Sequence, residues 1–185
     1  MGQHGIVSLK LVTNKYNLMM TIKKILYTLL FFTISVNAQV AIEKTAVDGS
    51  SILDFKSGTT KGIILPALSS IPVSPTNGLL AFYKVDAKVY MYENNIWVPL
   101  TEGNGNASAI INNASSEIGN GTIIGANTSS AVGVLVLESS TRALTLPKVD
   151  RPHLNVKGPY PGMICYDTAS NTIAVFDGSY WNFWK

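Results

Sequence analysis

Few residues of this 185-residue chain could carry out chemistry. The chain has one cysteine, Cys165, and two histidines, His4 and His153. A thiol next to an imidazole can act as a nucleophile and its base. However, Cys165 lies in the apolar stretch GMICYD, which predicts a small buried side chain in a β-strand. No phosphate-binding loop and no His or Cys pair at metal-binding spacing occurs in the sequence. We therefore expect no catalytic residue, no cofactor and no metal site.

The acidic residues are scattered along the chain and do not suggest a reaction. Asp48 and Asp54 are too isolated for a calcium loop, which needs several oxygen ligands at close spacing. Asp150 and Asp167 are predicted to serve turns. A glycosidase needs two carboxylates about 5 to 10 Å apart, and the sequence singles out no such pair. We therefore interpret the chain as a protein without enzymatic activity.

The C-terminal stretch FDGSYWNFWK is rich in aromatic residues. In a β-strand, Tyr180, Asn182 and Trp184 share one face because side chains alternate. Exposed aromatic faces stack on sugars, and an asparagine amide can bind hydroxyl groups. The residues that could contact a surface glycan or a neighbouring subunit are Tyr180, Asn182, Phe183 and Trp184. We favour packing against a subunit over binding of a sugar.

Residues 20–38, MTIKKILYTLLFFTISVNA, have the features of a secretory signal peptide. Lys23 and Lys24 precede a 12-residue apolar run, and Val36-Asn37-Ala38 provides a cleavage site before Gln39. The run is shorter than the roughly 20 apolar residues of a transmembrane helix. We therefore expect export to the cell surface or the extracellular space, with the periplasm as an alternative. No integral membrane segment is expected after the signal is removed.

Removal of this leader changes the net charge of the protein. The whole chain has 14 basic and 11 acidic residues, a net charge of +3. Four of the basic residues and none of the acidic ones lie in the first 38 residues, so the remaining chain has a net charge of −1. A nucleic-acid-binding protein is expected to keep a basic patch. Nucleic acid is therefore not an expected partner.

An internal repeat runs through the rest of the chain. The segment VAIEKTAVDGSSILDFKS aligns without gaps with TIIGANTSSAVGVLVLES, and TTKGIILPAL aligns with STRALTLPKV. After a short insertion, GLLAFYKVDAKVYMYENNIWVPL aligns with GMICYDTASNTIAVFDGSYWNFW. Residues that recur in both copies most simply serve the shared fold. We assign the following residues to the structural core of the repeat: Gly78, Tyr92 and Trp97, with their partners Gly162, Phe176 and Trp181.

Each copy is predicted to be β-structure. Runs such as GLLAFYK and KVYMYEN are rich in β-branched and aromatic residues and have the length of strands. The Asp177-Gly178 pair is a strong hairpin signal. We predict an all-β fold with two tandem copies of a short module, each an extended lead-in, a proline-marked bend and a three-stranded meander. A trimer of such chains would be β-prism-like. The predicted segments are an upstream extension 1–19, the signal peptide 20–38, copy one 39–100, a Gly/Asn/Ser-rich linker 101–121 and copy two 122–185.

The first copy resembles a repeat of secreted proteins from Bacteroidetes-type bacteria and is similar to segments of phage tail-fibre-like proteins. The residues that carry this resemblance are Ile42, Leu53, Asp54, Lys61, Gly62, Leu65, Pro66, Gly78, Leu79, Tyr92 and Trp97, echoed in copy two by Pro147, Gly162, Tyr166 and Trp181. Ala41, Glu43 and Ala67 depart from the pattern of the family. The resemblance implies an extracellular structural or adhesive β-module, and fibre members of this kind are typically intertwined trimers.

We therefore expect a secreted or cell-surface β-repeat protein that self-associates, as a homotrimer, and catalyses no reaction. One alternative is a carbohydrate-binding module that uses the C-terminal aromatic residues. A small outer-membrane β-barrel is a weaker alternative, because its strands would need about 10 residues and the predicted strands are shorter. The oligomeric state of the chain after Ala38 distinguishes these hypotheses best.

Overall fold

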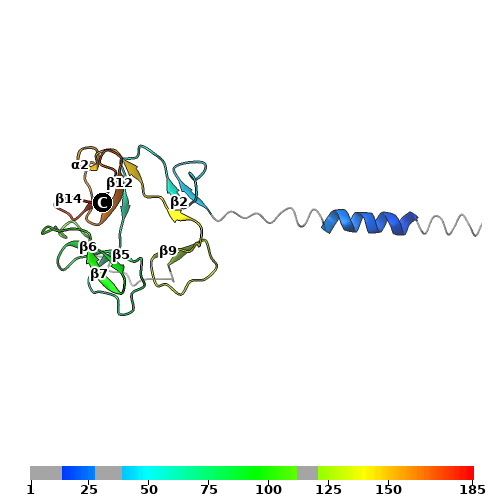
Figure 1. Cartoon of the computed structure of the whole chain (residues 1–185), viewed down its shortest axis with the longest axis horizontal. Coiled ribbons are helices and arrows are strands. Elements are labelled where there is room, and N and C mark those ends of the chain that lie inside the picture. The colour runs from blue at the N-terminus through cyan, green and yellow to red at the C-terminus, as the bar shows by residue number, and fades with distance from the viewer. Residues whose placement is uncertain (1–13, 28–38, 112–120) are drawn as a thin grey trace, which may run out of the picture. The chain divides into compact units, whose positions relative to one another are not determined.

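The computed structural model describes residues 14–27, 39–111 and 121–185 (Figure 1). The chain forms two compact units, Met1–Asn37 and Ala38–Lys185. In the first unit, residues 14–27 are helical. Within the described ranges, no helix is both long enough and apolar enough to cross a membrane. The predicted cleavage site, Val36-Asn37-Ala38, lies outside the described residues, next to the boundary between the units.

The second unit is almost entirely β-structure, which confirms the predicted all-β fold. Its strands are short, and α2 (Pro152–Asn155) is a single helical turn. The strands are β1 (Val40–Ile42), β2 (Ser51–Phe55), β3 (Ile63–Ile64), β4 (Ala67–Leu68), β5 (Leu80–Tyr83), β6 (Lys88–Glu93), β7 (Ile96–Pro99), β8 (Thr122–Ile124), β9 (Leu135–Leu137), β10 (Ala143–Leu144), β11 (Lys148–Val149), β12 (Met163–Asp167), β13 (Thr172–Phe176) and β14 (Trp181–Trp184).

Two parallel strand pairs form the lead-in parts of the chain. β1 pairs with β2 and places Val40 opposite Leu53, and β8 pairs with β9 and places Thr122 opposite Leu135. Both residues of the second pair lie 82 positions after those of the first. The two lead-ins therefore have the same register, as the sequence alignment requires.

Two meanders follow the same rule. In each, a short strand pairs in parallel with the first strand of an antiparallel three-stranded meander, giving the orders β4-β5-β6-β7 and β11-β12-β13-β14. Leu80 lies opposite Met91 in the first meander, and Ile164 lies opposite Val175 in the second. These pairs are 84 residues apart in the chain. The aligned residues therefore occupy the same places in the two sheets.

Two short strands, β3 and β10, pair with strands from the other half of the chain. β3, from the first half of the chain, pairs with β12 in the second meander. β10, from the second half, pairs with β2 in the first lead-in and gives a sheet of order β1-β2-β10. Strands from the first and the second half of the described chain are therefore interleaved in these sheets.

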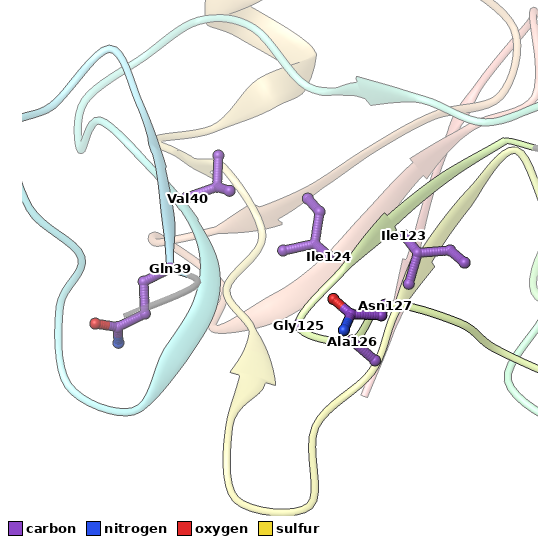
Figure 2. Close-up of a pocket in the computed structure, with 7 residues that line it drawn as sticks. All are labelled: Gln39, Val40, Ile123, Ile124, Gly125, Ala126 and Asn127. Atoms are coloured by element: carbon purple, nitrogen blue, oxygen red, sulfur yellow. The ribbon is translucent and has the colours of Figure 1, made fainter. Parts of the chain in front are cut away.

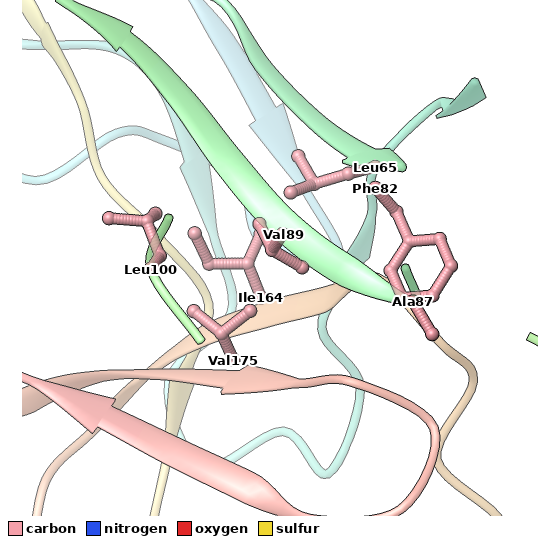
Figure 3. Close-up of a cluster of buried hydrophobic side chains, with 7 residues drawn as sticks. All are labelled: Leu65, Phe82, Ala87, Val89, Leu100, Ile164 and Val175. Atoms are coloured by element: carbon pink, nitrogen blue, oxygen red, sulfur yellow. The ribbon is translucent and has the colours of Figure 1, made fainter. Parts of the chain in front are cut away.

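The main core lies between the two meanders (Figure 3). The first meander contributes Phe82 and Val89, and the second contributes Ile164 and Val175. These four side chains are fully or almost fully buried. Because each meander covers an apolar face of the other, this core holds the two meanders together in one folded unit.

The first part of the predicted linker, residues 101–111, packs against this core. Thr101 is buried, and its Oγ1 accepts a hydrogen bond from the Val89 amide at 3.1 Å. The Asn106 amide donates to the Asp177 carbonyl oxygen at 2.8 Å, and Ile110 packs against the core. This part of the linker belongs to the folded unit. Residues 112–120 lie outside the described part of the chain.

Candidate functional site

The C-terminal strand β14 places the predicted contact residues on two different faces. Tyr180 is 68% exposed, and Phe183 and Trp184 are also exposed. The ring of Phe183 meets the ring of His153 edge to face, with 6.0 Å between centroids. Because side chains alternate along a strand, Asn182 and Trp184 lie on the opposite face, and Tyr180 precedes the strand. The four residues therefore do not form one continuous platform.

Asn182 is held by the hairpin turn before β14. Its Nδ2 donates to Asp177 Oδ2 at 2.9 Å, and its Oδ1 accepts from the Glu102 amide at 3.3 Å. Asp177 is fully buried and accepts hydrogen bonds from the amides of Ser179 and Tyr180 at 2.8 and 2.7 Å. The amide of Asn182 thus fixes the turn and the start of the linker, which leaves little of it to bind a ligand.

The recurring aromatic residues form the same cross-strand pair in both meanders. Tyr92 and Trp97 have ring centroids 5.0 Å apart, and Phe176 and Trp181 have centroids 5.4 Å apart. Trp181 also packs against the second buried cluster, which is defined here as Val149, Val156, Cys165 and Ala174. These contacts agree with a structural role for both pairs.

The recurring glycines precede the first strand of each meander and make the same backbone hydrogen bond. The amide of Gly78 donates to the Tyr92 carbonyl oxygen, and the amide of Gly162 donates to the Phe176 carbonyl oxygen, both at 2.8 Å. The φ angles of Gly78 and Gly162 are 95° and 84°, in the region that favours glycine. The assigned glycines are therefore required by the backbone.

Cys165 is a core residue, as its sequence context predicted. It is fully buried in the second cluster. Burial raises the pKa of the Cys165 thiol to about 12, with a smaller contribution from the charge of Asp167. A thiol with this pKa is not ionised near neutral pH, so it cannot act as an activated nucleophile.

Two buried carboxylates serve the backbone. Asp167 accepts hydrogen bonds from the amides of Arg151 and Ala169 and from Ser170 Oγ, so it stabilises a turn, as predicted. Asp54 accepts from Lys44 Nζ at 2.6 Å and from the Asp48 amide at 2.8 Å. Among the described residues, no group of three or more His, Cys, Asp or Glu side chains could hold a metal ion.

The pKa of Asp54 reflects two opposed effects. Burial by itself would raise the pKa of this carboxyl group. The hydrogen bonds from Lys44 and from the amides of Asp48 and Phe55 together outweigh burial and hold the pKa below its usual value. The Asp54 carboxylate is therefore a structural anchor for the loop between β1 and β2.

A hollow of about 360 Å³ lies between the two lead-ins (Figure 2). It is lined by apolar side chains such as Val40, Ile123 and Ile124, with Gln39 and Asn127 as its polar residues. The lining contains no ionisable side chain. The hollow therefore offers no group for acid–base or nucleophilic chemistry.

Exposed apolar side chains on three short strands at sheet edges are the remaining candidates for contact with a partner. Ile64 is 44% exposed, Leu135 is 46% exposed and Leu144 is 37% exposed. They belong to β3, β9 and β10. Exposed strand edges with apolar side chains favour pairing with another chain. Sequence analysis did not single out these residues, although the aligned segments TTKGIILPAL and STRALTLPKV mark two of the three strands.

The fold and this site define a class of protein: a repetitive all-β scaffold with strand edges suited to association. Residues 41–116 match the model of a family described as a phage tail like trimerisation region. The matched part contains β2 to β7 and all of β1 except Val40, and it is similar to a tail-fibre-like trimerising module. The comparisons with curated proteins and with solved structures gave no match.

Proposed function

We propose that this chain is an exported structural β-protein that self-associates as a homotrimer and works outside the cell or at its surface, in a structural or adhesive role. The observation that carries the proposal is the match of residues 41–116 to a trimerisation family. The exposed apolar side chains of β3, β9 and β10 support it, because assembly would cover them.

The proposal includes a duplication of the module within the chain. Its support is the common register of the two halves. Tyr92 pairs with Trp97 and Phe176 pairs with Trp181 at the same position of each meander. Equivalent pairs also occur in the lead-ins, where Ile42 lies opposite Phe55 and Ile124 lies opposite Leu137. Each chain would then bring two copies of the module to an assembly.

Export is proposed from the leader-like residues 20–38. The division of the chain between Asn37 and Ala38 supports this assignment, since it lies one residue before the predicted cleavage position. The N-terminal residue of the exported protein tests the proposal. Edman degradation or intact mass should place the new N-terminus at Gln39, and a retained leader would contradict it.

Glycan binding is the second candidate function. Exposure of Tyr180 and Trp184 favours it, whereas the hydrogen bonds of Asn182 to Asp177 and Glu102 disfavour it. Trp184→Ala should abolish any signal on a glycan array if these aromatic residues bind a sugar. Binding that persists in this variant would exclude the C-terminal strand as the sugar site.

Sedimentation velocity of residues 39–185 tests self-association directly. The second compact unit has its own core, so these residues can be studied without the leader. At micromolar concentration we expect a species with three times the mass of the protomer. A monomer under these conditions would overturn the proposal.

A further inference from the structure

The short strands β3 and β10, which lie in the predicted proline-marked bends, make their backbone hydrogen bonds on opposite sides of the strand. In β3, the carbonyl and amide groups of Ile63 face Ile164, and the Leu65 amide donates to the Gly162 carbonyl oxygen at 3.0 Å. In β10, the amides of Ala143 and Thr145 donate to carbonyl oxygens of the first lead-in at 3.0 Å. Successive backbone groups of a strand point to opposite sides. The two segments therefore use opposite sides.

β3 and β10 are equivalent segments of the sequence alignment. The alignment that pairs Pro66 with Pro147 also pairs Ile63 with Leu144. β3 thus docks on a meander with the side that contains Ile63, and β10 docks on a lead-in with the side that does not contain Leu144. Among the described residues, β3 pairs with no lead-in strand and β10 pairs with no meander strand. Within these residues β3 therefore pairs only with a meander, and β10 pairs only with a lead-in.

The first meander has a matching open position. On one edge of β12, β3 pairs at Ile164 and β11 pairs from Tyr166 onward. On the equivalent edge of β5, β4 pairs from Phe82 onward, and no strand of the described residues pairs there at Leu80. Leu80 is the counterpart of Ile164. The side of β10 that contains Leu144 and the edge of β5 at Leu80 are therefore complementary, and they are not paired with each other within the described residues.

We propose that a second copy of this chain joins them: β10 of one subunit adds to the open edge of β5 in the next. This inference rests on the proposed self-association and names its contact. The register follows from β3 and β12, where Ile63 lies opposite Ile164 and Ile64 lies opposite Met163. The intermolecular pairs are accordingly Leu144 with Leu80 and Thr145 with Leu79, in an antiparallel ladder.

The same contact between subunits also pairs the free side of β3. Within the chain, Ala143 lies opposite Ser51 in the parallel pair of β10 and β2. The equivalent intermolecular pair places Gly62 of the second subunit opposite Gly133 of the first, so that β3 adds to β9. This contact covers Ile64 and Leu135, two of the exposed apolar side chains.

The proposed contact is head-to-tail, so it can close into a ring of chains. One subunit offers β9 and β10, and its neighbour offers β3 and β5, so the two surfaces of the contact are different. Such head-to-tail contacts leave no unfilled surface only when the last chain meets the first. A ring of three chains meets this condition and agrees with the proposed trimer.

The residue of β10 that aligns with Gly62 of β3 is Ala143, and this difference affects how closely β10 can approach β5. A Cβ at Gly62 would lie 2.8 Å from the Ile164 carbonyl oxygen. Ala143 carries such a Cβ, so we expect the strands between subunits to lie slightly further apart than β3 and β12 do. The contact between subunits is then weaker than its counterpart within the chain.

Disulfide trapping tests the proposed register. Directly opposed residues of an antiparallel ladder have Cα atoms about 5.5 Å apart, within the range that a disulfide spans. The test protein carries Cys165→Ala, which removes the native thiol and restores the alanine found at the equivalent position, Ala81. Leu80→Cys and Leu144→Cys are then introduced together. The matched control combines Leu144→Cys with Val85→Cys, which is exposed in the turn after β5.

Under mild oxidation the Leu80→Cys/Leu144→Cys protein should give covalent dimers and trimers on a non-reducing gel, at least tenfold more than the Val85→Cys control. Dithiothreitol should reverse them. If the protein sediments as an oligomer but the two variants cross-link equally, the proposed contact is wrong while self-association stands. A disulfide within one chain would also overturn the contact. A monomeric parent protein would overturn both proposals.

Discussion

Trp181→Ala is the substitution that best tests the structural role of the recurring aromatic pair. Trp181 is half-buried and packs against Val149, Val156, Cys165 and Ala174 in the second cluster. Its ring also lies 5.4 Å from the ring of Phe176. Truncation to alanine removes the ring from both contacts and leaves a gap on this face of the second meander.

The expected loss of stability follows from the burial of the ring. Truncating a buried Trp or Phe to Ala costs about 3 to 5 kcal/mol. Because Trp181 is only half-buried, we expect the lower end, about 3 kcal/mol. For a domain of this size, 1 kcal/mol lowers Tm by roughly 2 to 4 °C. The melting temperature should therefore fall by about 6 to 12 °C.

Thermal unfolding of residues 39–185, followed by circular dichroism at fixed protomer concentration, measures this change. A fixed concentration is needed because association also stabilises the folded state. Trp181→Phe is the matched control, since it keeps an aromatic ring beside Phe176 and should lose less than half as much. A melting temperature that is unchanged in Trp181→Ala, or an equal loss in both variants, would refute the assignment.

Three further predictions concern the buried groups and one turn. Cys165 should not react with Ellman's reagent at pH 8 in the folded protein and should react fully in guanidinium chloride, because its thiol is buried and its pKa is raised to about 12; a fast native reaction would contradict this. Asp54→Asn should lower Tm at pH 7, since it removes the buried one of the two acidic partners of Lys44, the other being the exposed Asp48. The folded pKa of Asp54 is lowered, so its stabilisation is present above the unfolded value of about 4 and is lost as the pH falls through the folded value. The Tm of the two proteins should thus converge on acidification, and a constant difference would exclude the ionised carboxylate as the cause. Gly178→Ala should destabilise the fold by at least about 2 kcal/mol, because a Cβ there would overlap the Asn106 carbonyl oxygen and the φ of 96° disfavours alanine; urea unfolding measures it, and an unchanged midpoint would show that the linker is not packed on this turn.

The meanders could be predicted from sequence because their determinants are local. Asp177 and Gly178 lie in the turn between β13 and β14, as their types predicted. The spacing of Tyr92 from Trp97, and of Phe176 from Trp181, places each pair opposite one another once the turn is formed. Hairpin register depends on the turn and on side-chain alternation, and both can be read from the sequence.

The burial of individual residues in the C-terminal strand was less predictable. Trp181 and Phe183 share a face, yet Trp181 packs against the second cluster while Phe183 is exposed beside His153. The difference depends on where α2 and its flanking residues cover the sheet. In the same way, composition identified residues 101–121 only as a Gly/Asn/Ser-rich linker, and the packing of Ile110 on the core is visible only in the structure.

The sequence by itself determined the strands, the turns and the repeat, because alternation, glycine φ angles and recurring aromatic residues act over short distances. Only the tertiary structure decided which strand each bend segment meets. β3 and β10 have two residues each, too few for a pattern to specify a partner, and their partners lie far along the chain. Backbone hydrogen bonds are the same for every sequence, so the choice between the two sides of such a segment depends on which open edge the rest of the fold presents.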